Sequence, residues 1–222
     1  MATGLLQEGH EIEACVLLLA TWNFASFRYA ATTFDINGLR NVLGNELSAD
    51  FAALSECDLR TIDLTEHAGR IERIFDRLAS MKEVLYTGAT KLMHLKCPNT
   101  FVIWDDYIRG GKPKKYYENL PCVLSRKWSF RRYGVTGKGY LDFLSDIQSR
   151  VRHVPYPAGS KTLAKAIDEF HYVNITLPIQ RIEDERKAAG EIEKGRRRDA
   201  LRRLGRKVSL DELEQLASIE RD

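Results

Sequence analysis

The chain has 222 residues, of which 44% are hydrophobic and 29% are charged, and its net charge is +3. This length and composition are typical of a folded globular protein with one sizeable domain or two small ones. The longest apolar run, Ala14–Trp22, is much shorter than the roughly 20 residues of a membrane helix and follows an acidic segment, so we expect a cytoplasmic protein with no export signal and no membrane association.

The cysteines favour the same compartment. Four of them lie far apart and form no CxxC pair: Cys15, Cys57, Cys97 and Cys122. The spacing predicts neither a zinc site nor a cysteine-ligated iron–sulfur cluster, and we expect no metal and no other cofactor. Reduced thiols in the cytoplasm are the simplest interpretation.

The charges are unevenly distributed along the chain. Residues Met1–Ser80 contain six basic and twelve acidic residues, a balance of −6. Residues Arg109–Lys138, here called the basic segment, contain nine basic residues and only Glu118 as an acid, a balance of +8. Such segregation is typical of a surface that binds a polyanion, although a solvated loop gives the same pattern.

The first half of the chain reads as a series of helices. The composition of Glu11–Ala31 predicts a mostly buried helix that carries Trp22, Phe24 and Phe27. The next segment, Asp35–Leu43, predicts a turn followed by a short amphipathic helix. Ser48 is expected to cap the helix after that. The clearest helix is Thr65–Ser80, because apolar residues fall at i, i+3, i+4 and i+7: Ile71, Ile74, Phe75 and Leu78.

A second group of signals lies around Gly88. This glycine interrupts the helical pattern, and "ATKLMHL" resumes it until Pro98 ends the run, which predicts a helix, a tight turn and a short helix. Gly110 and Gly111 then break the chain again before the aromatic and basic residues that follow.

The remaining elements are also predicted to be helical. Leu141–Val151 is amphipathic, Ser160 is a cap for a helix that runs to about Tyr172, and the stretch after Pro178 has the dense mixed charge of an exposed helix ending at Gly205. Ser209–Glu212 fits the capping box of a final short helix. We therefore predict an all-α chain with a helical body over residues 1–177, of one sub-domain or of two around a cleft, and a charged helical arm over residues 178–222.

The segment from Val84 to Ile108, which contains "GATKLMHLKCPNTFVIWDDYI", resembles the helix-hairpin-helix DNA glycosylases, and in particular the lysine-bearing branch of the 8-oxoguanine DNA glycosylases. The order that carries the resemblance is a helix, a glycine turn, Lys91, a proline loop and Asp105. The turn has one glycine where that family usually has two, and the interval between the lysine and the aspartate is shorter.

The resemblance implies a helix-hairpin-helix-like element and a chemistry. Lys91 would be the nucleophile, Asp105 would lie near the deoxyribose, and the backbone of Gly88 would contact phosphate. An unprotonated lysine attacks C1′ of an extruded nucleotide, displaces a damaged base such as an oxidised purine, and leaves a Schiff base from which strand scission follows. Because an ordinary lysine is protonated at neutral pH, its site must lower its pKa.

Damaged duplex DNA is the partner that this reading predicts. Five cations of the basic segment are candidates for phosphate contacts: Lys114, Lys115, Arg126, Arg131 and Arg132. Aromatic residues between them would stack on unpaired bases. The rival interpretation is that these cations pair with the acidic N-terminal half.

Structural alternatives stay open for each candidate. Lys91 would then be a solvated lysine, Asp105 or Asp106 a helix cap, His94 a hydrogen-bonded structural residue and Trp104 a core residue. Two other functions also stay open: a nucleic-acid-binding protein without catalysis, and a helical interaction protein whose charged arm docks on a partner chain. Neither the recognised base nor the oligomeric state follows from the sequence.

Overall fold

The computed structural model divides the chain into two compact units, Met1–Pro178 and Ile179–Asp222. It describes residues 1–23, 27–29, 31–118, 120, 122, 131–156 and 161–204, with side chains up to 197. Every regular element within these residues is helical, which confirms the all-α prediction. No helix in this part of the chain has the length and apolarity that a bilayer crossing needs.

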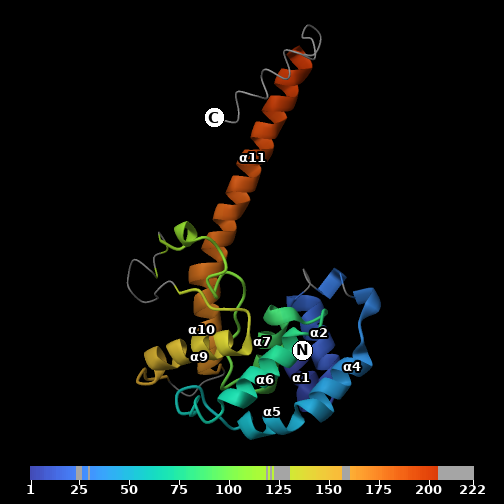
Figure 1. Cartoon of the computed structure of the whole chain (residues 1–222), viewed down its shortest axis with the longest axis vertical. Coiled ribbons are helices and arrows are strands. Elements are labelled where there is room, and N and C mark those ends of the chain that lie inside the picture. The colour runs from blue at the N-terminus through green and yellow to red at the C-terminus, as the bar shows by residue number, and fades with distance from the viewer. Residues whose placement is uncertain are drawn as a thin grey trace. The chain divides into compact units, whose positions relative to one another are not determined.

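The first unit is built from short and medium helices, shown in Figure 1. In chain order they are α1 (Ala2–Gln7), α2 (Glu11–Trp22), the 3-10 turn η1 (Ala31–Thr33), α4 (Ile36–Asn41), the π-helix η2 (Val42–Glu46), α5 (Ser48–Leu54), α6 (Ala68–Ala79), α7 (Leu85–Lys96), the 3-10 turn η3 (Lys114–Tyr116), α9 (Gly137–Val151), α10 (Leu163–His171) and the π-helix η4 (Tyr172–Thr176). A last helix, α11 (Leu177–Leu204), follows η4 directly.

The core lies around α6, which packs against both α7 and α9. The predicted apolar face of α6 is confirmed, because its four apolar residues are fully buried. Phe75 on this face stacks on Tyr140 of α9 at a centroid distance of 5.1 Å, and Trp104 meets Phe75 edge-on at 5.7 Å. Trp104 is therefore a core residue, as its structural alternative predicted, and it anchors the segment that leads to Asp105.

Three helix ends differ from the predictions. Helix α2 ends at Trp22, and the side chain of Trp22 is exposed rather than buried, while Phe24 lies outside the described residues. Ser48 is the first residue of α5 and makes no capping hydrogen bond. Thr162 caps α10 by accepting a hydrogen bond from the amide of Lys165, and Ser160 lies outside the described residues. The predicted turn and helix after Asp35 are confirmed, with Asp35 as the cap of α4.

The predicted turn at Gly88 is wrong. Gly88 lies inside α7, and its amide donates to the carbonyl of Val84 in the ordinary helical manner, so it offers no free hairpin amide to a phosphate. The reversal between α6 and α7 comes earlier, over residues 80–84. Gly88 is instead a contact glycine, because an added Cβ would lie only 3.0 Å from side-chain atoms of Leu19 and Asn23. The end of α2 can therefore approach α7 closely.

The exposed, charged helix predicted after Pro178 is confirmed in the second unit. From residue 184 to 197 of α11 the side chains are exposed. Oppositely charged neighbours one turn apart pair along it: Lys187 with Asp184, Lys194 with Glu191 and Arg197 with Glu193. Helix α11 ends at Leu204, while Gly205 and the predicted final helix at Ser209–Glu212 lie outside the described residues.

Candidate functional site

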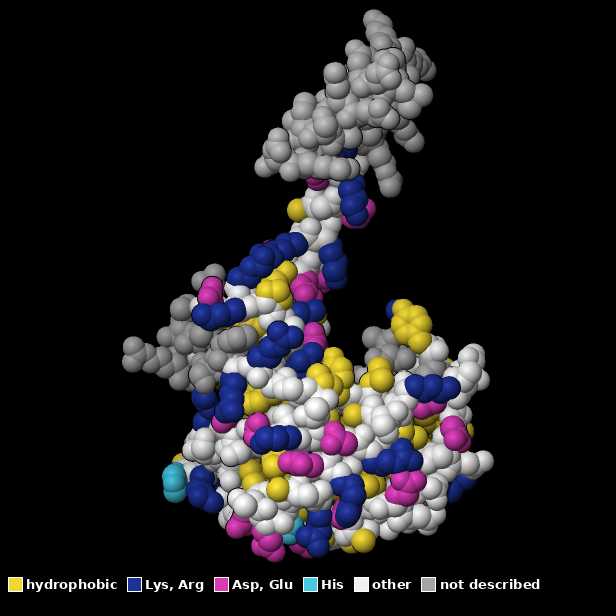
Figure 2. All heavy atoms as spheres, viewed as in Figure 1, with side chains coloured by type: hydrophobic (Ala, Val, Ile, Leu, Met, Phe, Trp, Pro, Cys, Tyr) yellow, Lys and Arg dark blue, Asp and Glu magenta, His cyan; other side chains and the backbone are white. Residues whose placement is uncertain are grey.

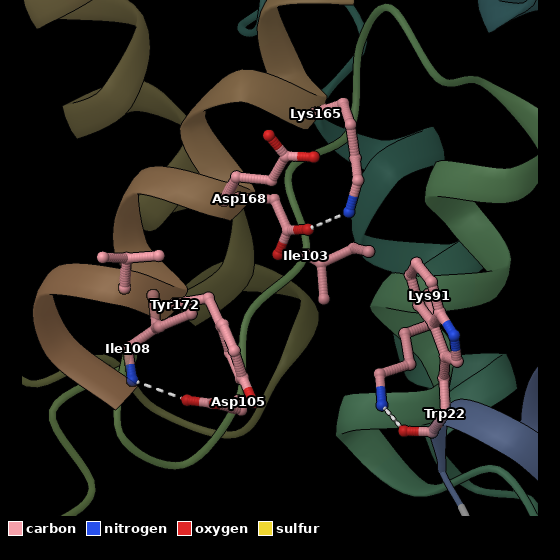
Figure 3. A pocket seen from close by; sticks show the side chains of 10 residues that line it. Trp22, Lys91, Ile103, Asp105, Ile108, Lys165, Asp168 and Tyr172 are labelled. Atoms are coloured by element: carbon pink, nitrogen blue, oxygen red, sulfur yellow. Dashed lines mark hydrogen bonds and ion pairs between the residues drawn. The ribbon is translucent and has the colours of Figure 1, made fainter. Parts of the chain in front are cut away.

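Lys91 and Asp105 line one pocket of about 400 Å³ in the first unit, here called the Asp105 pocket. Figure 3 shows that Lys91 and Trp22 lie on one side of it and that Asp105, Asp168 and Tyr172 lie on the other. Its walls come from the end of α2, from α7, from the loop after α7, and from α10 and η4: Trp22, Lys91, Ile103, Asp105, Ile108, Lys165, Asp168, Glu169, Tyr172 and Val173.

Two hydrogen bonds bring the lysine and the aspartate to the same pocket. The hydroxyl of Thr90 accepts from the amide of Trp104 at 3.3 Å, and these two residues directly precede Lys91 and Asp105. One turn further along α7, the ring Nδ1 of His94 donates to the carbonyl of Phe101 at 2.6 Å. The segment 101–104, which has no regular secondary structure, is therefore fixed along α7. His94 is therefore a hydrogen-bonded structural residue, as expected from the sequence if it has no functional role.

Lys91 is partly buried. Burial lowers the pKa of its amine to about 8, and the carboxylates of Asp105 and Asp168 oppose that shift. Its Nζ donates a hydrogen bond to the carbonyl of Trp22, the last residue of α2. Gly88 lies one helical turn before Lys91 on the same face, so the contact glycine helps to set the position of this acceptor. The environment thus shifts the pKa of Lys91 in the direction that an amine nucleophile needs.

Asp105 is held rigidly by three donors. Its Oδ1 accepts from the amides of Tyr107 and Ile108, and its Oδ2 accepts from the hydroxyl of Thr176, each at 2.8 Å. Burial raises the pKa of this carboxyl group, while these donors and Lys91 oppose the shift. No helix opens at Asp105, since residues 106–110 form turns, so Asp105 caps a turn rather than a helix.

Several residues of the pocket were not predicted from the sequence. Lys165 and Asp168 form an ion pair of 2.6 Å, and the ammonium of Lys165 lies 4.8 Å from the centre of the Trp22 ring. Tyr172 is about half exposed at the pocket. The π-helical turn η4 supplies both Tyr172 and, at its end, Thr176. The only sequence signal for these residues is a lysine and an aspartate three apart on α10, which is an ordinary surface pattern.

The basic segment is largely paired with nearby acids. Arg109 pairs with Asp106, which is therefore neither free in solvent nor a cap; Lys114 lies 3.6 Å from Glu118, and Arg131 lies 2.9 Å from Asp146. None of these acids belongs to the acidic stretch Met1–Ser80. The four described candidates for phosphate contacts, Lys114, Lys115, Arg131 and Arg132, are exposed, and Arg126 lies outside the described residues.

The surface charge of the first unit is mixed on the face drawn in Figure 2, where Lys and Arg lie among Asp and Glu. Acids of the N-terminal half have their own basic partners, as Asp50 pairs with Arg73 and Glu46 with Arg77. Among the residues that the structure describes, no cluster of His, Cys, Asp and Glu is arranged to hold a metal ion.

Comparisons with family models, with curated proteins and with solved structures give no match. The geometry of the Asp105 pocket is therefore the basis for assigning a function.

Proposed function

We propose that this protein is a DNA glycosylase with AP lyase activity that acts on a damaged base through Lys91. The observation that supports this proposal is the shared pocket: an amine with a pKa lowered to about 8 and a fixed carboxylate line the same cavity of about 400 Å³. That volume lies within the range of small-molecule sites, and the half-exposed rings of Trp22 and Tyr172 offer faces on which an extruded base stacks.

The proposed reaction follows from these groups. The neutral amine of Lys91 forms a bond to C1′ of the extruded nucleotide, and the bond from C1′ to the base breaks, so the base departs with the bonding electrons and takes up a proton. The fixed carboxylate of Asp105 stabilises the positive charge that develops on the sugar. Ring opening and loss of the second amine proton give the Schiff base. Removal of a C2′ proton then expels the 3′ phosphate, and water releases the lysine.

The test is covalent trapping on duplex DNA that contains an abasic site, because this substrate needs no knowledge of the damaged base. Borohydride should reduce the Schiff base and link the wild-type protein to the DNA. Lys91→Ala should abolish the adduct while it leaves the helical circular dichroism unchanged. Lys96→Ala is the matched control, since Lys96 lies on the same helix and pairs with Glu11 at 2.7 Å outside the Asp105 pocket. Equal trapping by Lys91→Ala would refute the proposal.

A second candidate, a nucleic-acid-binding protein without catalysis, is favoured by one contact. The amine of Lys91 donates to the carbonyl of Trp22, which is also what a lysine that only caps the end of α2 would do. This candidate predicts salt-dependent DNA binding, no adduct with the wild-type protein and little effect of Lys91→Ala on affinity.

Once the lyase activity is established, a panel of duplexes with single oxidised, alkylated or deaminated bases would identify the base released.

A further inference from the structure

A second pocket, of about 550 Å³, adjoins the Asp105 pocket and is here called the Lys161 pocket. Helices α1, α2 and α7 and the start of α10 contribute its walls. The two pockets share four residues: Trp22, Lys91, Ile103 and Lys165. Lys91 is therefore part of the wall of both cavities, and the two cavities are neighbours.

The two pockets differ in the sign of their charges. All three carboxylates, those of Asp105, Asp168 and Glu169, belong to the lining of the Asp105 pocket. The described lining of the Lys161 pocket contains no Asp or Glu, and its charged groups are the lysines Lys91, Lys161 and Lys165. The described charged side chains of the Lys161 pocket are thus all cationic, while the carboxylates belong to the lining of the Asp105 pocket.

The acidic groups also hold these lysines in place. Lys161 pairs with Glu169 at 2.7 Å, and Lys165 pairs with Asp168 at 2.6 Å. An ammonium group has three donors, so each lysine keeps hydrogen-bonding capacity for an anion in the Lys161 pocket. The side chain of Lys161 is about half exposed, which leaves it accessible to a ligand from solvent.

The rest of the lining limits the class of that anion. Much of the Lys161 pocket is apolar, with side chains that include Leu17, Leu18, Leu95 and Pro98, and the hydroxyls of Thr3, Thr21 and Thr162 add polar contacts. The ring of Trp22 in the same lining offers a face for stacking, so this surface beside ammonium groups suits a ligand that combines rings with negative charges. A polynucleotide strand has this combination in each nucleotide.

We propose that the Lys161 pocket binds the part of the DNA strand that flanks the extruded nucleotide, with Lys161 and Lys165 contacting its phosphodiester groups. This inference rests on the proposed function, because it places the extruded nucleotide in the adjoining Asp105 pocket. The division of charge then matches the chemistry: carboxylates face the sugar on which positive charge develops, and lysines face the phosphates.

The experiment measures binding separately from chemistry. Fluorescence anisotropy follows a labelled duplex that carries a tetrahydrofuran abasic analogue, which has no aldehyde and forms no Schiff base. Lys161→Glu should raise Kd about tenfold at moderate salt and should lower the slope of log Kd against log salt by about 1. Lys138→Glu is the matched control, because Lys138 also loses an ion pair, with Asp142 at 3.3 Å, and lines neither pocket.

Three outcomes would overturn the inference or separate it from the proposed function. Equal Kd and equal salt slope for Lys161→Glu and Lys138→Glu would refute the strand contact. A polyglutamate peptide could compete with the labelled duplex as strongly as unlabelled DNA does. If Lys161→Glu abolishes that competition, the pocket binds an acidic protein segment instead. DNA binding that depends on Lys161, without any borohydride adduct, would refute the lyase activity and retain the strand contact. A borohydride adduct together with DNA binding that does not depend on Lys161 would retain the lyase activity and refute the strand contact.

Discussion

The Asp105 pocket and the basic segment are both charged, but they use charge in different ways. In the pocket, Lys91 and Asp105 are largely buried and come from separate elements that two hydrogen bonds hold together. In the basic segment, the described cations are exposed, and several of them pair with acids close by. Exposed pairs are screened by water and contribute little to stability, whereas burial shifts the pKa of a group and prepares it for chemistry. The net charge of a segment therefore does not show whether its side chains are buried or already paired.

The largest effect is expected at Asp105. Asp105→Ala removes the acceptor of three hydrogen bonds and should lower the free energy of unfolding by about 2–3 kcal/mol, measured by urea denaturation. Asp105→Asn keeps an oxygen for the two amides and an NH₂ group for the hydroxyl of Thr176, so stability should fall by less than about 1 kcal/mol. Trapping should nevertheless drop about 100-fold, because the negative charge is lost. If the asparagine variant retains full trapping, Asp105 is only a cap.

The pH dependence should report the ionisation of Lys91. The initial rate of strand scission at an abasic site should rise with pH around a midpoint near 8, because only the neutral amine attacks. Asp168→Asn removes a carboxylate that holds this pKa up, so the midpoint should move to lower pH. Asp142→Asn, which removes the partner of Lys138, should leave the midpoint unchanged. A profile that is flat between pH 6 and 9 would exclude the lysine as the titrating group.

Substitution of Lys91 should raise the stability of the protein, in contrast to Asp105→Ala, and by a smaller amount. The pKa of this amine is lower in the folded chain than its ordinary value of 10.5, so carrying a proton below pH 8 costs folding free energy. Lys91→Met should therefore stabilise the protein by about 1 kcal/mol at pH 7, and the gain should shrink as pH rises from 8 to 10.5. Lys96→Met, which breaks the ion pair with Glu11, should give no gain. Destabilisation by Lys91→Met would mean that the contact with Trp22 outweighs the burial of charge.

The smallest effects are expected in the basic segment. Arg131→Gln and Arg132→Gln should each change the free energy of unfolding by less than about 0.5 kcal/mol, since both side chains are exposed. Each should weaken binding of the abasic-analogue duplex less than Lys161→Glu does. A tenfold loss for either arginine variant, with no loss for Lys161→Glu, would reverse the comparison and return DNA binding to the basic segment.

The sequence alone determined the helical class and several boundaries. The apolar spacing in α6, the turn and short helix after Asp35, and the end of α7 before Pro98 were predictable, because periodicity and the missing amide of proline act within a few residues. The order of Lys91, Pro98 and Asp105 also indicated the two candidate side chains, Lys91 and Asp105. These signals are local, and they survive in any arrangement of the helices.

The tertiary structure decided the rest. Gly88 was expected to form a turn, but its role depends on how closely Leu19 and Asn23 of α2 approach α7, which no local pattern encodes. Thr176 reaches Asp105 across 71 residues of sequence, and Lys165 and Asp168 enter the pocket only because α10 packs beside the loop after α7. Burial, and with it the pKa of Lys91, depends on which elements meet in space. The sequence thus indicated Lys91 and Asp105 as candidates, and packing between distant helices gave these two side chains their environment.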